Sequence, residues 1–297
     1  MTALGSNAAS SPPVLSTATE LRSITSQWRC HGLAVGLVAT MGSLHRGHLS
    51  LVAAARAQCD RVVVSIFVNP LQFGPGDDFQ RYPRDARRDR DQLSAAAVDA
   101  IYMPAVSEVY PPGFSTMVSV ALPGLDRFEG AARPGHFQGV ATVVAKLFAA
   151  TGPARAYFSE KDAQQAVMVS TLARDLDLGV EVEVCPIVRD PDGLALSSRN
   201  AYLLSEQRPD SRLLSRWLRE AQVRFDKGQT DSGSLRRLAG EIFREGRWIS
   251  LEYAEVVDPL TFVPVELCTG SSRLLIAARL GGIRLIDAAT LGGQRVP

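Results

Sequence analysis

The feature that most constrains this fold is a regular alternation of short apolar runs with longer helical patterns. Runs rich in β-branched residues are each followed by a stretch whose apolar residues recur at helical spacing. Strands separated by helices in this way predict a parallel, doubly wound α/β sheet with right-handed crossovers. The expected strands cover residues 33–39, 62–68, 100–103, 155–158 and 180–187, and the expected helices cover residues 49–59, 84–97, 139–150 and 163–178.

The pattern changes after about residue 203. Polar amphipathic helices are expected at residues 205–224 and 232–247, and three strand-like runs follow at 250–257, 272–278 and 283–286. This order predicts a smaller α+β domain with antiparallel strands. The turn signal Asp-Pro-Asp-Gly places a linker at residues 190–198. We therefore expect a disordered Ala/Ser/Pro-rich tail at residues 1–13, one domain over 14–190 and another over 191–297.

Composition excludes several classes of protein. The formal net charge is only +1, which argues against an electrostatic nucleic-acid binder. No apolar stretch approaches the roughly 18 residues typical of a membrane-spanning helix, and the N-terminus lacks a signal-peptide pattern. The four cysteines are widely spaced, which is typical of reduced thiols in a cytoplasmic protein. The arginine-dense run at residues 81–91, with interleaved aspartates, favours a solvated amphipathic helix.

Residues 41–48 read Met-Gly-Ser-Leu-His-Arg-Gly-His and hold two of the four histidines. They lie where an expected strand runs into an expected helix, so the first helical turn would carry His45 and His48 on one face. Helix N-termini attract anions, and two imidazoles there indicate a phosphate-handling site. Taken alone, the pattern equally fits one core histidine and one solvated histidine beside a turn.

Polar segments follow other expected strands, and ligands of such sheets bind beyond the carboxyl ends of the strands. Lys161, in Ser-Glu-Lys-Asp at 159–162, can hold a phosphate as a point charge. Residues 196–199, Leu-Ser-Ser-Arg, can wrap a polyphosphate with two hydroxyls and a guanidinium. Residues 67–74 offer an asparagine and a glutamine to a small polar ligand. Each segment alone also fits an ordinary capped surface turn.

Two further segments add polar groups. Gln164 and Gln165 open the helix after the lysine segment, and we expect one to face solvent and the other to face the cleft. The turn at residues 133–137 carries His136, which would cap or position a loop or serve a purely structural role.

Taken together and in order, these segments resemble the pantothenate synthetase (pantoate–β-alanine ligase) family of the HxGH nucleotidyltransferase superfamily. The resemblance implies a Rossmann-like N-terminal domain that binds ATP and pantoate, and a C-terminal α+β lid. Weaker similarity continues through residues 253–258 and 279–287. The matching stretches are residues 40–48, 67–74, 82–84, 133–137, 161–165 and 192–200.

The resemblance also implies a reaction. Pantoate would be ligated to β-alanine in two steps, through a pantoyl adenylate formed from ATP with release of pyrophosphate, followed by release of AMP. Adenylation supplies a leaving group that a free carboxylate lacks, and an anion approaching a polyanion needs cations and Mg²⁺. The implied partners are these small molecules and a second copy of the chain in a homodimer.

Residue roles follow from the resemblance, position by position. The catalytic set is His48, His45, Lys161, Ser197, Ser198 and Arg199. Asp89 falls where the family has an acidic residue near the metal. The substrate contacts are Gln72, Gln165, Asn69 and His136. The ATP-binding residues are Met41, Gly42, Ser43, Leu44, His45, Arg46, Gly47, His48, Ser159, Glu160, Lys161, Asp162, Val188, Leu196, Ser197, Ser198 and Arg199.

Three positions depart from the family pattern. Arg46 replaces an acidic residue, Leu196 replaces a methionine of similar volume, and Ser159 replaces a glycine. A glycine permits unusual backbone angles or close approach, and a serine there would crowd the nucleotide. Two alternatives therefore stand beside the ligase: another HxGH-type nucleotidyltransferase, and a catalytically impaired relative.

Overall fold

The computed structural model describes residues 11–297. Residues 1–10 of the predicted disordered tail lie outside the described residues. At the end of the predicted tail, the Pro13 carbonyl accepts a hydrogen bond from the Ile101 amide. None of the helices in residues 11–297 combines the length and the apolar character needed to span a membrane.

A six-stranded parallel sheet forms the larger unit, in the order β1-β4-β3-β2-β5-β6. The central strands β2 and β3 are rich in valine and buried because helices cover both faces of the sheet. The predicted doubly wound α/β sheet is confirmed. The strands are β1 (Val14–Leu15), β2 (Val35–Thr40), β3 (Arg61–Ile66), β4 (Ala100–Tyr102), β5 (Arg155–Ser159) and β6 (Glu181–Cys185).

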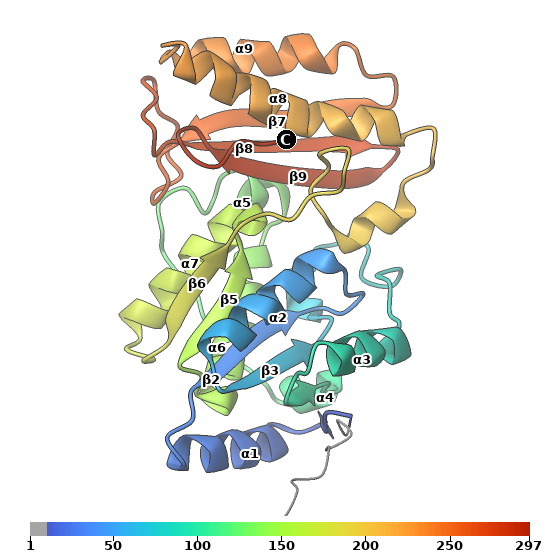
Figure 1. Cartoon of the computed structure of the whole chain (residues 1–297), viewed down its shortest axis with the longest axis vertical. Helices are drawn as coiled ribbons and strands as arrows, with labels where there is room; N and C mark the ends of the chain where they lie inside the picture. The colour runs from blue at the N-terminus through green and yellow to red at the C-terminus, as the bar shows by residue number, and fades with distance from the viewer. Residues whose placement is uncertain (1–10) are drawn as a thin grey trace, which may run out of the picture.

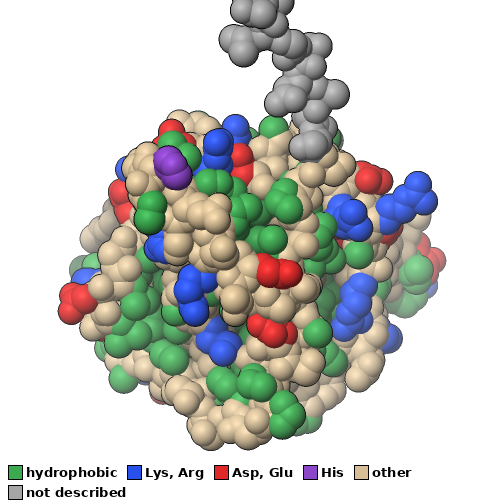
Figure 2. Space-filling model, turned by 90° about the horizontal axis from the view of Figure 1, so that it is seen from below, with side chains coloured by type: hydrophobic (Ala, Val, Ile, Leu, Met, Phe, Trp, Pro, Cys, Tyr) green, Lys and Arg blue, Asp and Glu red, His purple; other side chains and the backbone are tan. Residues whose placement is uncertain are grey.

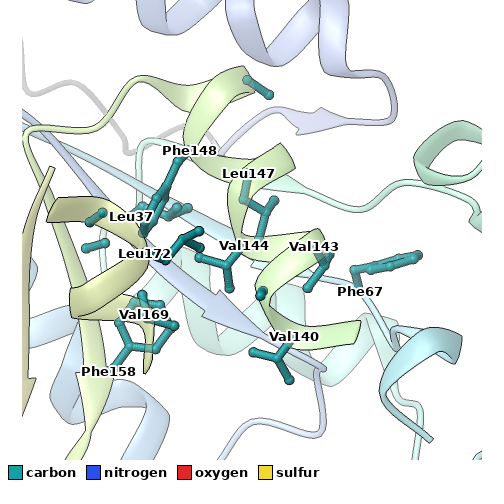
Figure 3. Close-up of a cluster of buried hydrophobic side chains, with 14 of the residues drawn as sticks. Leu37, Phe67, Val140, Val143, Val144, Leu147, Phe148, Phe158, Val169 and Leu172 are labelled. Atoms are coloured by element: carbon teal, nitrogen blue, oxygen red, sulfur yellow. The ribbon is translucent and has the colours of Figure 1, made fainter. Parts of the chain in front are cut away.

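Alternate side chains of the strands point into two separate cores. On one face, Leu37 and Phe158 pack with residues of α1, α6 and α7 (Figure 3). On the other face, Val38 and Tyr157 pack with residues of α2 and α3. The helices of this unit are α1 (Ala18–Cys30), α2 (Arg46–Gln58), α3 (Ala86–Ala95), α4 (Val106–Val109), α5 (Glu129–Ala132), α6 (His136–Thr151) and α7 (Ala163–Asp175).

The strand order reverses between β2 and β5. From β2 the chain proceeds through β3 to β4 on one side, and from β5 it proceeds to β6 on the other. The segments after β2 and β5 therefore leave the sheet side by side at this switch point, where open α/β sheets bind ligands.

The smaller unit is an antiparallel sheet in the order β7-β8-β9, and α8 and α9 pack against one of its faces (Figure 1). Trp217 of α8 is fully buried there, and its indole N–H donates to the Leu235 carbonyl. The predicted α+β unit is confirmed. Its elements are α8 (Arg208–Asp226), α9 (Ser232–Phe243), β7 (Ile249–Val257), β8 (Arg273–Leu280) and β9 (Ile283–Thr290).

The other face of the small sheet packs against the larger unit. Phe262, Leu275 and Ala288 are buried there against Ala163 at the start of α7. Figure 1 shows the small unit lying across the carboxyl-end side of the large sheet. The small sheet therefore forms a roof over the segments that follow β2 and β5.

Two expectations from the sequence were incomplete or wrong. Helix α1 was not predicted, because Leu21 and Thr25 are its only buried residues. The run at residues 81–91 is helical only from Ala86, and Asp89 is buried rather than solvated because two backbone amides hold its carboxylate.

The surface opposite the small unit carries mixed charge. On the face seen from below, basic and acidic side chains lie dispersed among apolar and uncharged ones (Figure 2). The four cysteines are free. The mixed surface charge agrees with the even balance of charges in the sequence, and the free cysteines agree with the thiols expected from their spacing.

Candidate active site

The loop between β2 and α2 is held in shape by a buried carboxylate. Asp89 of α3 accepts hydrogen bonds from the Ser43 amide at 2.9 Å and from the Leu44 amide at 2.8 Å. Gly42 and Ser43 both have left-handed backbones, with φ of 79° and 50°. A side chain at Gly42 would lie 2.9 Å from the Asp89 carboxylate, so glycine is required there. Asp89 thus fixes the course of the HxGH loop.

His45 caps helix α2, and its Nδ1 accepts a hydrogen bond from the Gly47 amide at 3.1 Å. A Cβ at Gly47 would lie 2.9 Å from the His45 ring, which explains the glycine between the two histidines. The His45 and His48 rings stack with their centroids 4.0 Å apart. The Nδ1 of His48 is buried and has no partner among the described residues.

Both rings are neutral at pH 7. Burial, and after it the charge of Lys161, lowers the pKa of His45 to about 4. Burial, with His45 and Lys161, lowers the pKa of His48 to about 3. Since His45 accepts through Nδ1, its proton lies on Nε2. The pair therefore offers hydrogen bonds to an anion, and the net positive charge of the site comes from lysine and arginine.

The lysine segment forms the short 3₁₀ helix η2 (Glu160–Asp162) directly after β5. The Ser159 hydroxyl caps this turn by accepting a hydrogen bond from the Lys161 amide at 3.2 Å. The backbone at Ser159 is extended, with φ of −91°, so this position does not require glycine. Ser159 therefore supports the turn that presents Lys161, which weakens the argument for an impaired relative.

The carboxylates beside Lys161 point in different directions. The Glu160 carboxylate accepts a hydrogen bond from Arg273 of β8 at 2.6 Å, and it also lies within 3.4 Å of the Thr290 hydroxyl. Asp162 lies 3.6 Å from the Lys161 ammonium. The side chain of Glu160 thus links the lysine turn to the roof, and the structure gives it no place in a nucleotide pocket.

The Ser-Ser-Arg segment returns to the HxGH loop. Leu196 donates its amide to the Val188 carbonyl at 3.0 Å, which closes a turn over residues 188–196. Ser197 caps the 3₁₀ helix η3 (Ser198–Tyr202), and the Ser198 hydroxyl donates to the Ser43 carbonyl at 3.1 Å. This contact joins two loops that lie 155 residues apart in the sequence.

Arg46 belongs to the same region but points outward. Its guanidinium is largely exposed and lies 2.8 Å from the Asp190 carboxylate, which also pairs with Arg208. The replacement of an acidic residue by Arg46 therefore places a cation at the rim, where it ties the start of α2 to the linker.

Arg199 is already paired. Its Nε and Nη2 donate to the two carboxylate oxygens of Asp78 at 2.9 and 2.7 Å, and its guanidinium lies over the Tyr82 ring at 5.7 Å. Burial raises the pKa of Asp78, but the hydrogen bonds and charge of Arg199 outweigh burial and lower it overall. Asp78 was not singled out from the sequence.

Asn69 and Gln72 lie just after β3, around the 3₁₀ helix η1 (Pro70–Gln72). Asn69 is buried, donates to Gln72 Oε1 and the Gly139 carbonyl, and accepts from the Leu71 amide and the Tyr110 hydroxyl. All its hydrogen-bonding capacity is used. Gln72 keeps one amide proton beyond its 3.2 Å contact with Met41 Sδ. Asn69 thus orients Gln72 and offers nothing more to a ligand.

His136 begins α6 and is also saturated. Its Nδ1 lies 2.8 Å from the Gln72 carbonyl and its Nε2 lies 3.1 Å from Arg133 Nη1, so Nδ1 carries the proton. Burial, with the charge of Arg133, lowers the pKa of His136 to about 4. Arg133, which the sequence argument did not single out, also donates to the Gln72 carbonyl and pairs with Asp77.

The two glutamines of α7 differ from the expectation. Gln164 is buried, accepts from the Glu129 amide and donates to the Gly124 and Arg127 carbonyls, so it does not face solvent. Gln165 faces the cleft, and its side chain makes no hydrogen bond among residues 11–297.

These segments enclose one cleft with two compartments. The inner compartment, about 200 Å³, lies at the carboxyl ends of β2, β3 and β5, and both histidines and Gln72 line it. The outer compartment, about 400 Å³, continues between the two units. The apolar wall of the inner compartment comprises Leu51, Phe67, Val140, Val143, Val144 and Leu147. Both compartments are lined by Arg133, His136, Lys161, Asp162, Gln165, Ser197 and Arg199.

The side chains present do not fit a metal site made by the protein. Residues 11–297 contain no group of three or more His, Cys, Asp or Glu side chains that could hold an ion. Asp89 points both carboxylate oxygens at backbone amides of the HxGH loop. The placement of Asp89 near a metal stays a prediction that this geometry does not favour.

Comparison with known proteins agrees with this geometry. Residues 13–290 match the family model described as pantoate-beta-alanine ligase. The pantothenate synthetase of Acidobacterium capsulatum is 50% identical over 253 residues, covering 85% of this chain and 84% of the relative. That of Roseiflexus sp. (strain RS-1) is 49% identical over 272 residues, covering 92% and 96%.

Solved structures give the same result. The pantothenate synthetase of Thermus thermophilus superposes with a TM-score of 0.88 at 46% identity, covering 94% of this chain and 99% of that one. A pantoate-beta-alanine ligase from Francisella tularensis, complexed with beta-gamma ATP and beta-alanine, gives a TM-score of 0.77 at 30% identity, covering 95% and 99%. The chain belongs to the pantoate-beta-alanine ligase family.

Proposed function

We propose that this chain condenses pantoate with β-alanine, using ATP and passing through a pantoyl adenylate. The observation that carries the proposal is the convergence of three anion-binding segments on one apolar-walled compartment. The HxGH loop, the lysine turn and the Ser-Ser-Arg segment meet there, and Ser198 is bonded to the HxGH loop through the Ser43 carbonyl.

The inner compartment suits pantoate. Pantoate carries a geminal dimethyl group beside two hydroxyls and a carboxylate, so it needs an apolar wall faced by hydrogen-bonding groups. Val140, Val143 and Val144 of α6 supply that wall. Gln72 and Gln165 also line the compartment and supply free amide protons. Asn69 and His136 act indirectly: Asn69 holds the side chain of Gln72, and His136 holds its backbone carbonyl.

The first step forms a bond between a pantoate carboxylate oxygen and the α-phosphorus of ATP. The bond from that phosphorus to the bridging oxygen breaks, and pyrophosphate leaves with the electron pair. Lys161 and Arg199 supply positive charge at the phosphates, and neutral His45 and His48 supply hydrogen bonds beside the α2 N-terminus. Ser197 caps the helical turn that carries Arg199, and Ser198 holds this turn against the HxGH loop.

The second step forms the amide. The amine of β-alanine attacks the acyl carbon, the bond to the adenylate oxygen breaks, and AMP leaves while the nitrogen loses a proton. The outer compartment leads to the acyl carbon because it shares Lys161, Gln165 and Arg199 with the inner one. We expect the roof over the cleft to limit the access of water, which would otherwise hydrolyse the adenylate.

Further properties belong to the same proposal. We assign residues 14–190 to ATP and pantoate binding and residues 191–297 to the lid. Mg²⁺ usually binds substrate phosphates and retains waters, so we place it on ATP and give it no cage of protein ligands. A homodimer in the cytoplasm follows from the family resemblance, and sedimentation of the purified chain tests the dimer.

The deciding experiment separates the two steps. Purified protein given ATP, Mg²⁺ and pantoate, without β-alanine, should release pyrophosphate and accumulate pantoyl adenylate. Absence of the adenylate under these conditions would refute the ligase. His48→Ala should lower this activity by roughly 10²-fold or more, as for loss of one group that stabilises developing charge. The exposed His31 provides the matched control, since His31→Ala should retain full activity.

A further inference from the structure

The loop between β3 and α3 inserts two consecutive carboxylates into the cleft. Asp77 pairs with Arg133, and Asp78 pairs with Arg199. Both carboxylates line the outer compartment. The two arginines belong to different segments and face the same cavity. Each is paired with one of two adjacent aspartates of a single loop.

The Asp78–Arg199 pair has the geometry of a bound oxyanion. Arg199 uses Nε and Nη2, the two donors along one edge of the guanidinium, and each reaches a different oxygen of Asp78. The same two donors can bind two oxygens of a phosphate in a bidentate complex. The pair is also partly withdrawn from water, with side-chain exposures of 25% for Arg199 and 16% for Asp78.

The rest of the contact would hold Arg199 in place if Asp78 left. The guanidinium lies over the ring of Tyr82, and Tyr202 of η3 donates to the Arg81 carbonyl at 2.5 Å. Helix η3 is therefore fixed to the loop at residues 81–82 independently of Asp78. Exchange of the carboxylate for a phosphate would leave these two contacts in place.

We propose that Asp78 is a positioning residue that occupies the phosphate site on Arg199 in the free enzyme and is displaced by the polyphosphate of ATP. This inference rests on the proposed role of Arg199 in phosphate binding. Asp78 keeps the guanidinium aimed into the cleft while no anion is bound. It also competes with the polyphosphate, so it weakens ATP binding and favours departure of pyrophosphate.

The sign of one effect tests the proposal. Asp78→Asn keeps the size of the side chain and removes its charge. ATP binding, measured by calorimetry with Mg²⁺ and without pantoate, should tighten about two- to fivefold, the upper part of the range for one partly exposed ion pair. Inhibition by pyrophosphate should tighten in parallel. Asp91→Asn, an exposed change of the same charge on α3, controls for net charge and should leave both constants unchanged.

The arginine variant separates this inference from the proposed function. Arg199→Ala should weaken ATP binding, and adding Asp78→Asn to it should then have no further effect. Unchanged or weaker ATP binding in Asp78→Asn, with Arg199→Ala still impaired, overturns the role of Asp78 alone. Unchanged binding in Arg199→Ala overturns the phosphate role of Arg199 and this inference with it.

Discussion

Asp89 provides the sharpest test of how the HxGH loop is built. Its carboxylate accepts the amides of Ser43 and Leu44, and it lies against Gly42 where the backbone is left-handed. Asp89→Asn keeps the shape but offers a single oxygen acceptor, so one loop amide must face an NH₂ group. The substitution therefore removes one charge-assisted hydrogen bond and leaves a donor without a partner.

The magnitude follows from those two contacts. A hydrogen bond to a charged group contributes about 1.5–3 kcal/mol, and Asp89→Asn should lower the free energy of unfolding by about this amount. At about 2–4 °C per kcal/mol, the scale for domains of similar size, the midpoint should fall by about 3–12 °C. The loop carries both histidines, and a displacement near 1 Å costs about 10²-fold in rate, so kcat should fall as well.

Thermal unfolding and pyrophosphate release together decide between two roles for Asp89. A residue that holds the loop should lose both stability and kcat, and added Mg²⁺ should restore neither. Asp91→Asn, exposed two residues further along α3, is the control and should resemble the parent. The reasoning is refuted if Asp89→Asn melts within about 1 °C of the parent, well below the expected fall, or if excess Mg²⁺ restores its activity.

Three further predictions concern the same site. Gly47→Ala should cost at least about tenfold in kcat because the new methyl group would push the His45 ring off its cap, and wild-type turnover would contradict this. Ser159→Gly should change the KM for ATP by less than about threefold, since the serine backbone is extended; a large gain in affinity would show that the hydroxyl crowds the nucleotide. Buried neutral His136, with its pKa lowered to about 4, makes unfolding easier as pH falls from 6.5 toward 4, because the unfolded chain binds a proton there that the folded chain does not. Each such histidine adds up to about 1.4 kcal/mol per pH unit to that slope, so His136→Gln should reduce the slope by up to that amount; an unchanged slope in His136→Gln would contradict the reasoning.

The sequence predicted the fold well where burial imposes a strong pattern. The strand at residues 35–40 is buried almost throughout because helices cover both faces of the sheet there. Its apolar run could therefore be recognised in the sequence. Helix α1 lacks such a stripe, and its signal was the capping box formed by Thr17 and Glu20. Helix α2 begins at Arg46 rather than residue 49 because the His45 side chain caps it. Such caps are set by side-chain contacts that periodicity does not register.

The segments that form the site were predictable from the sequence, but the side-chain contacts between them were not. Strand ends put Lys161 and the histidines at one edge, as the alternating pattern implied. The contacts of Asp78 and Asp89 could not be foreseen because each residue lies among other charged residues in the sequence. A single buried carboxylate within a charged run has no signature in composition or spacing, since only the tertiary structure decides which acid meets an amide or an arginine.

Hydrogen-bond capacity divides the polar residues of the cleft into two groups. Asn69 and His136 use every donor and acceptor within the protein, so a ligand could contact them only by breaking a bond already made. Gln165 and the Nδ1 of His48 have no partner among residues 11–297, so they can bind a ligand at no such cost. Substrate recognition therefore falls to the second group, together with the free amide proton of Gln72. Changes in the first group should act by displacing Gln72, and they should alter kcat and pantoate KM together.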